Sequence, residues 1–416
     1  MVLAAMLRRW VWSPCLLLLG AAGDSCFVHL KKPLEAPPFS AAEEAELWRL
    51  FEANVNVNGL GAVIASPGAC PAQVDCCGIM DPMPYGFHWT RDASLSLLTL
   101  LERVERSTRH NDEPVSMAPS LRGWRTSDST LPELRSDVEK TIVAYAAWVA
   151  RMHGRTRLAG NLESVQSAAE EAFVEPKWSF DGEPYRGGWC RPQTDGPALR
   201  ARLLMRAAEI FPHLVNETLW PLAQKDLDWL VEHHSMESCD LWEETRDSDF
   251  LWNRVVQLAA LVEGHHFATD PVLKRRYLDA AQQKGKALAN HVANHSAGEE
   301  FLTNCPAMNA GKDCVKYNKT LDGVLILTLI HGRPMVPTEH LQLPKFLDPV
   351  VANTVRQLSL VFCESYPINQ EDTAAEVPGV LMGRYAKDRY GHQKEGNPWV
   401  LITASLANLL YKACSG

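Results

Sequence analysis

Three carboxylates surround a tryptophan in the segment Cys239-Asp240-Leu241-Trp242-Glu243-Glu244. A carboxylic acid that protonates a departing glycosidic oxygen near neutral pH needs a raised pKa. An apolar ring and anionic neighbours raise a carboxyl pKa, and Trp242, Asp240 and Glu244 offer both around Glu243. The alternative interpretation is a solvated helix start, where the helix dipole favours carboxylates. Other segments of the chain decide between the two.

The composition favours a neutral polar ligand. The chain has 416 residues, with 41 Lys and Arg against 50 Asp and Glu and a net charge of −9. This balance disfavours nucleic acids and anionic membranes as partners. Neither Cys-x-x-Cys nor His-Glu-x-x-His spacing occurs, so we expect no metal site. We find no P-loop, no dinucleotide-binding glycine motif and no Gly-x-Ser-x-Gly elbow, which disfavours nucleotide-dependent and serine hydrolase chemistries. Proton transfer and electrostatics can supply the chemistry of a carboxylic acid site, so we expect no organic cofactor.

The first residues, 1–23, have the pattern of a secretory signal peptide. Arg8 and Arg9 precede an apolar run that ends in small residues, and cleavage is expected between Ala22 and Ser25. A signal anchor or an organelle leader is the alternative. The run is too short to span a membrane, and we predict secretion or a secretory-pathway lumen. Three glycosylation sequons agree with this prediction, at Asn216, Asn294 and Asn318.

Eleven cysteines are present, of which one lies in the predicted leader. In an oxidising compartment the other ten could form several disulfides. Cys305 and Cys314 lie nine residues apart in a loop rich in Pro, Asn and Gly, so we expect them to pair with each other. The adjacent Cys76 and Cys77 need separate partners or stay free.

Apolar residues recur at helical spacing in most of the chain, and we expect ten helices and no strand. Ser40 and Glu43 have the spacing of a capping box at the first helix. The polar, Pro-rich segment from Ser107 to Leu131 is expected to be a surface excursion. Long helices alternate with loops that carry Trp, Arg and Asp, which suggests paired helices with one loop-bearing face. The helices are expected near residues 40–51, 92–104, 134–152, 198–211, 219–234, 247–266, 270–293, 320–330, 348–362 and 397–412.

Four blocks together resemble the glucoamylase family, in the order of that family: 89–92 (WTRD), 189–200 (WCRPQTDGPALR), 240–244 (DLWEE) and 383–399 (GRYAKD through GNPW). The resemblance runs from about residue 40 to the last helix. It implies an all-α fold, an (α/α)6 barrel of paired helices, formed by a domain at 40–416. It also implies an inverting, exo-acting glucan 1,4-alpha-glucosidase. Ten helices where the barrel has twelve would leave the last helix pair missing.

The resemblance also implies roles for single residues. Glu243 matches the general acid and Glu244 a substrate-binding carboxylate. Asp240 is a second catalytic candidate, and in a helix it would share a face with Glu243. Arg and Asp side chains supply directional partners for sugar hydroxyls, and indole rings cover pyranose faces; core packing is the alternative for any single Trp. The substrate-binding candidates are Trp89, Arg91, Asp92, Trp189, Arg191, Asp195, Trp242, Glu244, Arg384, Tyr385, Asp388 and Trp399.

Three departures from the family pattern bear on activity. The water-activating base of the family is a Glu well beyond the last block, whereas this sequence stops at Gly416. Cys190 replaces a Gly and is expected to add bulk near the pocket floor, and Arg246 could lower the pKa of Glu243. The expected substrate is an alpha-glucan, soluble rather than granular. The alternatives are a non-catalytic descendant that binds maltooligosaccharides and another (α/α)6 enzyme acting on a different disaccharide.

Overall fold

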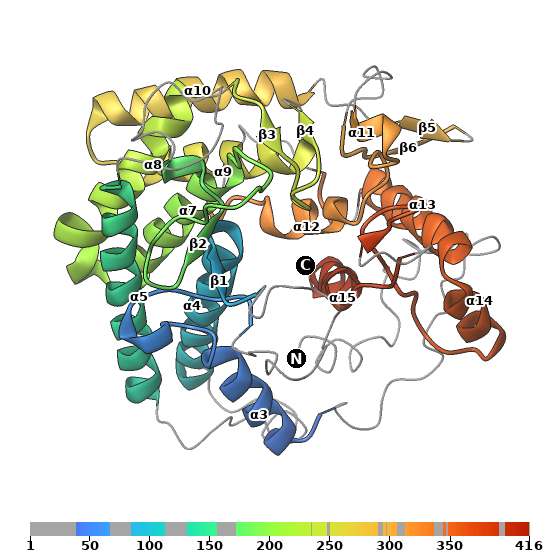
Figure 1. Ribbon diagram of the computed structural model, residues 1–416, viewed down its shortest axis with the longest axis horizontal. Coiled ribbons are helices and arrows are strands. Elements are labelled where there is room, and N and C mark those ends of the chain that lie inside the picture. Colours follow the sequence, from blue (N-terminus) through green and yellow to red (C-terminus); the bar gives the residue numbers. More distant parts are fainter. Residues whose placement is uncertain are drawn as a thin grey trace. The chain divides into compact units, whose positions relative to one another are not determined.

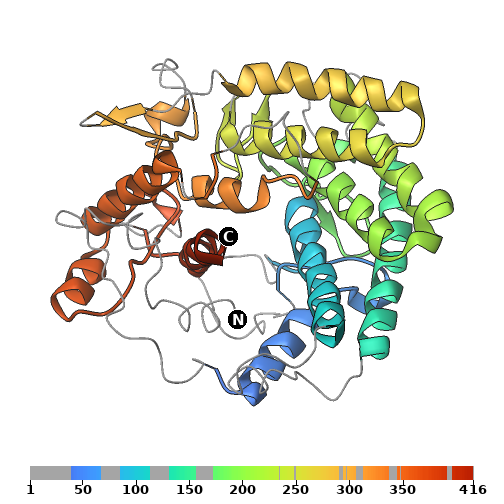
Figure 2. The same ribbon diagram turned by 180° about the vertical axis from the view of Figure 1, so that it is seen from behind.

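The computed structural model (Figures 1 and 2) describes residues 39–66, 85–112, 131–155, 172–233, 235–247, 250–289, 294–296, 298–305, 313–336, 344–346, 348–390 and 396–415. The expected signal peptide and the Cys76-Cys77 pair lie outside these residues. The chain forms two compact units. The N-terminal unit comprises Ser40–Cys239 and Ala260–Ala280, and the C-terminal unit comprises Met1–Phe39, Asp240–Ala259 and Ala281–Gly416.

The N-terminal unit is a set of packed helices with a small antiparallel ladder. Helix α7 packs against α4 and α8, and α5 also contacts both α4 and α8; Figure 2 shows α4 and α5 side by side. Strand β1 pairs with β2, so that Trp89 lies opposite Lys177. The elements are α3 (Ala41–Glu52), η2 (Val57–Gly59), β1 (Phe87–Trp89), α4 (Thr90–Asp112), α5 (Leu131–His153), β2 (Lys177–Ser179), α7 (Asp195–Ile210), η4 (Pro212–Leu214), η5 (Val215–Leu219), α8 (Trp220–Glu232) and β3 (Ser238–Cys239).

The helix starts follow local chemistry. At α3, the hydroxyl of Ser40 accepts the backbone N–H of Glu43, and the carboxylate of Glu43 accepts the backbone N–H of Ser40. This is the predicted capping box, and it satisfies donors that the first turn leaves unpaired. Pro221 occupies the first turn of α8, where a missing N–H costs no intrahelical bond.

Helix α7 is buried along almost its whole length. It carries two arginines into the interior, and each is paired with a carboxylate: Arg200 with Asp226, and Arg202 with Glu263. Buried charges need such partners because desolvation of an isolated ion is costly. These ion pairs hold α7 in place. The preceding loop ends at Asp195, the first residue of α7, so one end of that loop is held as well.

The C-terminal unit is built around an apolar helix. All seven residues from Val324 to Ile330 in α12 are buried, and α12 packs against α15. The β5–β6 ladder and α14 both pack on α13, as Figure 1 shows. The elements are β4 (Arg246–Asp247), α9 (Leu251–Phe267), α10 (Pro271–Ala289), β5 (Asn294–Ser296), β6 (Glu299–Phe301), α11 (Asp313–Lys316), α12 (Val324–His331), α13 (Pro349–Ser365), α14 (Pro367–Ala374) and α15 (Val400–Ser415); α9 and α10 each contribute residues to both units.

The all-α prediction is confirmed, and all ten expected helices are present. Three details differ. Strands of two or three residues occur, which are too short to give a periodic signal. Helix α4 continues to Asp112, so the segment expected as a surface excursion from Ser107 begins as helix, and residues 113–130 lie outside the described structure. The short helices α11 and α14 were not expected.

Candidate active site

The segment Asp240–Thr245, here called the acid loop, is a turn and not the start of a helix. The Asp240 carboxylate accepts the backbone N–H groups of Glu244 (2.8 Å) and Thr245 (3.1 Å). The backbone N–H of Glu243 donates to the Asp240 carbonyl at 3.0 Å, and Glu243 has a φ of 64°. The expectation that Asp240 and Glu243 share a helical face is therefore wrong, because the short Asp side chain bonds its own backbone and favours a turn. Glu243 lies half-buried in this turn.

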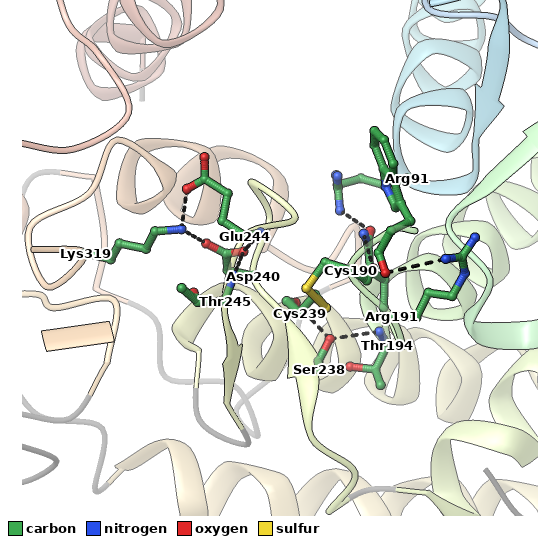
Figure 3. The surroundings of a disulfide bond; sticks show 12 residues. Arg91, Cys190, Arg191, Thr194, Ser238, Cys239, Asp240, Glu244, Thr245 and Lys319 are labelled. Atoms are coloured by element: carbon green, nitrogen blue, oxygen red, sulfur yellow. Dashed lines mark hydrogen bonds and ion pairs between the residues drawn. A yellow bond between two sulfur atoms is a disulfide. The ribbon is translucent and has the colours of Figure 1, made fainter. Parts of the chain in front are cut away.

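Lys319 connects two carboxylates of the acid loop (Figure 3). Its ammonium forms an ion pair with the buried Asp240 and another with Glu244 at 2.7 Å. Lys319 and Asp240 are 1% and 2% exposed, so this pair is shielded from water. The oxygens of Asp240 are thus engaged by two backbone amides and an ammonium. We expect Asp240 to hold the loop in shape, a role compatible with its place among the catalytic candidates.

Glu244 is surrounded by donors. It forms an ion pair with Arg384 at 2.7 Å and accepts the Tyr385 hydroxyl at 2.5 Å, in addition to its pair with Lys319. Burial raises the pKa of Glu244, but the two cations outweigh it and hold the pKa below its usual value. Glu244 is therefore an ionised acceptor, as a carboxylate that binds sugar hydroxyls must be.

Arg384 is the centre of an aromatic enclosure in the same unit. Its guanidinium bonds Asp388 through Nε (2.7 Å) and Nη2 (2.5 Å). It also lies 5.4 Å from the ring of Trp242, 5.1 Å from Trp399 and 4.9 Å from Tyr390. Flat rings around a rigid, charged donor are the components of a pyranose-binding surface. Six predicted site residues are thus brought together: Trp242, Glu244, Arg384, Tyr385, Asp388 and Trp399.

Sequence reasoning missed Lys319 and a second residue, Asp322, which accepts the indole N–H of Trp242 at 2.9 Å. Asp322 also accepts the backbone N–H of Val324 at the start of α12. Lys319 lies inside a glycosylation sequon, which drew attention to Asn318 alone, and the position of Asp322 before an apolar helix was a capping signal. Burial raises the pKa of Asp322 to about 7, so this carboxyl is partly protonated near neutral pH.

Stability should therefore depend on pH through Asp322. Its pKa is 3.8 in an ordinary environment and about 7 here, so the folded state binds more protons between these values. The free energy of unfolding should fall as pH rises through this window, by at most about 1.4 kcal/mol per unit from this group. In Asp322→Asn that contribution is absent. Urea unfolding at pH 5 and 7.5 should therefore show that the free energy of unfolding of the variant, relative to that of the parent, increases as pH rises. A stability difference between variant and parent that is equal at both pH values would contradict the assignment.

In the N-terminal unit, Arg91 and Asp92 occupy the first turn of α4. Arg91 donates to Gln193 and to Asp195, both at 2.9 Å, and is itself buried. The Asp92 side chain is 57% exposed and lies 4.0 Å from the Arg91 guanidinium. Asp195 thus orients Arg91, and Asp92 remains accessible to a ligand.

Four aromatic rings enclose a buried ammonium beside this pair. The Nζ of Lys177 lies 3.9 Å from the ring of Trp189, 4.0 Å from Tyr185, 4.3 Å from Phe87 and 4.9 Å from Trp89. The rings of Trp89 and Trp189 are 6.0 Å apart. Cation–π attraction in a desolvated site is worth about 2 kcal/mol, so Lys177 holds these rings in a fixed arrangement. Two predicted sugar-stacking residues, Trp89 and Trp189, therefore belong to one cluster.

Arg191, a predicted substrate-binding residue, makes several contacts within the protein. Its guanidinium pairs with the buried Glu175 at 2.5 Å and donates to the carbonyls of Tyr185 (2.7 Å) and Gly187 (3.1 Å). These contacts engage both ends of the guanidinium with the protein. Arg191 therefore shapes the loop around Trp189, and we expect it to act on substrate through that loop.

Two disulfides have both partners in the described residues. Cys305 pairs with Cys314, as expected, and the bond is buried against Phe250. Cys190 pairs with Cys239. The expectation that Cys190 adds free bulk to the pocket floor did not foresee this bond, because nothing in the spacing indicates a partner 49 residues away. Arg246 is exposed in β4.

The described parts of the chain contain no cluster of three or more His, Cys, Asp or Glu side chains that could hold a metal ion. In the same residues, we find no helix with the length and apolar character that crossing a membrane requires.

Comparisons with known proteins agree on one family. The family model of glycosyl hydrolases family 15 matches residues 53–415. Glucoamylase-1 of Arthroderma benhamiae is 28% identical over 393 residues, covering 92% of this chain and 54% of that protein. The glucoamylase of Blastobotrys adeninivorans is 26% identical over 368 residues, covering 83% and 52%. The chain spans about half the length of these curated relatives.

Solved structures agree in fold. The Saccharomycopsis fibuligera glucoamylase superposes with a TM-score of 0.67 at 21% identity, over 89% of this chain and 71% of that one. The Hormoconis resinae glucoamylase gives 0.63 at 24% identity, over 90% and 56%. The expected (α/α)6 helical fold of the glucoamylases is therefore confirmed. With a family match over residues 53–415, this chain belongs to the glycosyl hydrolases of family 15.

Proposed function

We propose that the protein hydrolyses terminal 1,4-linked alpha-D-glucose from the nonreducing ends of starch-like or glycogen-like chains, with inversion to beta-D-glucose. The observation that carries the proposal is the acid loop. It presents Glu243 beside Glu244, a carboxylate kept ionised by Lys319 and Arg384. Two neighbouring carboxylates in different environments are what acid catalysis and sugar binding at one site require.

Glu243 is the proposed general acid, which gives its proton to the glycosidic oxygen as the bond to the anomeric carbon breaks. Water attacks that carbon from the opposite face and loses its proton to a base, so one water is consumed for each glucose released. Asp240 or another carboxylate is the proposed base. The hydroxyl-binding and ring-binding candidates are Arg91, Asp92, Glu244, Arg384 and the tryptophans at 89, 189, 242 and 399.

A second function has support of its own. Asp240, the base candidate within the acid loop, is ion-paired and accepts two backbone N–H groups. The oxygens of such a carboxylate are already engaged by protein donors and have less capacity to orient an attacking water. A protein that binds maltooligosaccharides without cleaving them would need the same aromatic and Arg-Asp surfaces and no base.

We further propose that the protein enters the secretory pathway. The leader pattern of residues 1–23 supports this, and the sequon residues Asn216 and Asn318 are exposed. One homologue is described as an intracellular, sporulation-specific glucoamylase of Saccharomyces cerevisiae, so the compartment is a property to test in this chain.

One experiment separates the two functions. The protein is expressed in a secreting eukaryotic host, where its recovery from the medium and its loss of mass after N-glycan removal also test the compartment. Maltotriose is then incubated with the purified protein, and proton NMR follows the anomeric signals. Early appearance of beta-glucose supports inverting hydrolysis, and early alpha-glucose contradicts inversion. If no glucose is released while maltotriose quenches tryptophan fluorescence, the binding-only function holds.

A further inference from the structure

The Cys190–Cys239 disulfide joins two segments that matter to the proposed site. Cys190 directly follows Trp189, a ring of the Lys177 cluster. Cys239 ends β3, and the next residue along the chain is Asp240, the first of the acid loop. The bond closes a loop of 49 residues, and both cysteines belong to the N-terminal unit.

The chain before Trp189 contains two glycines and is restrained by hydrogen bonds from the Arg191 side chain. Gly187 and Gly188 are exposed, and a Cβ on Gly188 would meet no atom within 4 Å. Glycine has the greatest backbone freedom of any residue. On this side, Arg191 donates hydrogen bonds to the carbonyls of Tyr185 (2.7 Å), Gly187 (3.1 Å) and Trp189 (3.4 Å).

The chain after Trp189 is fastened to β3, as Figure 3 shows. The backbone N–H of Cys239 donates to the carbonyl of Pro192 at 2.8 Å, and the backbone N–H of Thr194 donates to the Ser238 hydroxyl at 3.0 Å. The disulfide adds a covalent connection at Cys190, the residue next to Trp189. A covalent bond at the adjacent residue therefore limits, together with the Lys177 contact, how far this indole can move.

The position of Trp189 matters because its ring is one wall of an ordered cluster. It lies 6.0 Å from the ring of Trp89 and 5.7 Å from that of Tyr185, and 3.9 Å from the Lys177 ammonium. Its indole N–H is buried, and the described residues provide no hydrogen-bond partner for it.

We propose that the Cys190–Cys239 disulfide is a positioning bond for Trp189, and that a dithiol reductant weakens maltooligosaccharide binding by breaking it. The choice of ligand rests on the proposed function. In the reaction, one thiolate of the dithiol attacks a sulfur of the bond and the second closes the cyclic disulfide. The dithiol loses two electrons and the protein gains two cysteine thiols, each protonated. Cys190 is the half-buried partner and Cys239 is 1% exposed, so attack at Cys190 is favoured.

The test compares the parent with Cys190→Ala/Cys239→Ala by hydrogen exchange and by maltotriose binding. Exchange in residues 187–194 should be faster in the variant, with that of α4 and α7 unchanged. The maltotriose Kd from tryptophan quenching should rise by about fivefold, the factor for ordering one side chain on binding. Dithiothreitol should weaken binding by the parent to the same extent and leave the variant unaffected. Equal exchange in 187–194 and equal Kd would overturn the proposal.

Two controls keep the outcomes distinct. Cys305→Ala/Cys314→Ala removes the other bond and should keep the protection of 187–194 and the response to dithiothreitol. If the Cys190 and Cys239 variant does not fold, exchange is measured on the parent with and without dithiothreitol, and alkylation with mass spectrometry identifies which cysteines were reduced. A parent that neither binds nor cleaves maltotriose contradicts the proposed function, while the exchange of 187–194 still decides whether the bond positions the loop.

Discussion

Glu243→Gln is expected to lower kcat for maltotriose by about 10²- to 10⁴-fold, the contribution of a general acid. Glutamine fits the turn and keeps a polar side chain at this position but has no proton to give to the glycosidic oxygen. KM should change much less, because Arg384, Glu244 and the aromatic rings remain in place. Initial rates of glucose release, measured over a range of maltotriose concentrations, separate the two parameters.

The substrate provides a control for the role of the acid. Alpha-glucosyl fluoride loses fluoride without the help of a strong proton donor, so the variant should hydrolyse it far better than maltotriose, relative to the parent. Glu371→Gln is the matched control, since Glu371 is exposed on α14 of the same unit, and should leave both rates unchanged. If Glu243→Gln loses activity on both substrates equally, Glu243 is not the proton donor.

Lys319→Met should give a large loss of stability in the C-terminal unit. The Lys319–Asp240 pair is 1% and 2% exposed, and removal of one partner from a buried pair costs about 3–5 kcal/mol. Asp240 would keep two backbone N–H donors but lose the cation that neutralises it. The pKa of Glu244 should also rise, because Lys319 lowers it in the parent. Urea unfolding followed by circular dichroism measures the effect.

Lys345→Met provides the comparison, because Lys345 is exposed in the same unit and its loss should change stability by less than about 0.5 kcal/mol. Asp240→Asn added to Lys319→Met removes the unpaired charge and should restore part of the loss. A double variant that is as unstable as the sum of both single changes would show that the two side chains do not act as a pair.

The sequence predicted correctly those features of the fold that are formed by residues close together in the chain. The Ser40 capping box, the α-helical stripes and the Cys305–Cys314 bond each depend on residues fewer than ten positions apart. The acid loop was misread although it is local, because Asp240 to Glu243 has the spacing of a helical face and also that of a turn closed by an aspartate. In the structure the Asp240 carboxylate accepts the backbone N–H groups of Glu244 and Thr245, which is the turn.

The remaining site depends on contacts between distant residues. Lys319 and Asp322 lie 79 and 80 residues from their acid-loop partners, Asp240 and Trp242, and no spacing rule relates such positions. The motif at 189–200 located the loop around Trp189 but not how it is held, since an arginine or cysteine in a loop has many possible partners. Arg191 was therefore expected to bind substrate and Cys190 to add bulk to the pocket floor. The sequence did not indicate that Arg191 pairs with Glu175 or that Cys190 forms a disulfide with Cys239.

The backbone of Glu243 has a consequence for how this protein can evolve. A φ of 64° suits glycine and is tolerated by asparagine, whereas a residue with a longer side chain loses about 1–2 kcal/mol there. Selection for stability alone would therefore replace the glutamate. A single base change in a glutamate codon gives glycine, so one mutation can remove the proposed acid and relax the turn together. Lineages that lose selection for glucan cleavage would then drift readily toward stable proteins that bind sugar and do not cut it.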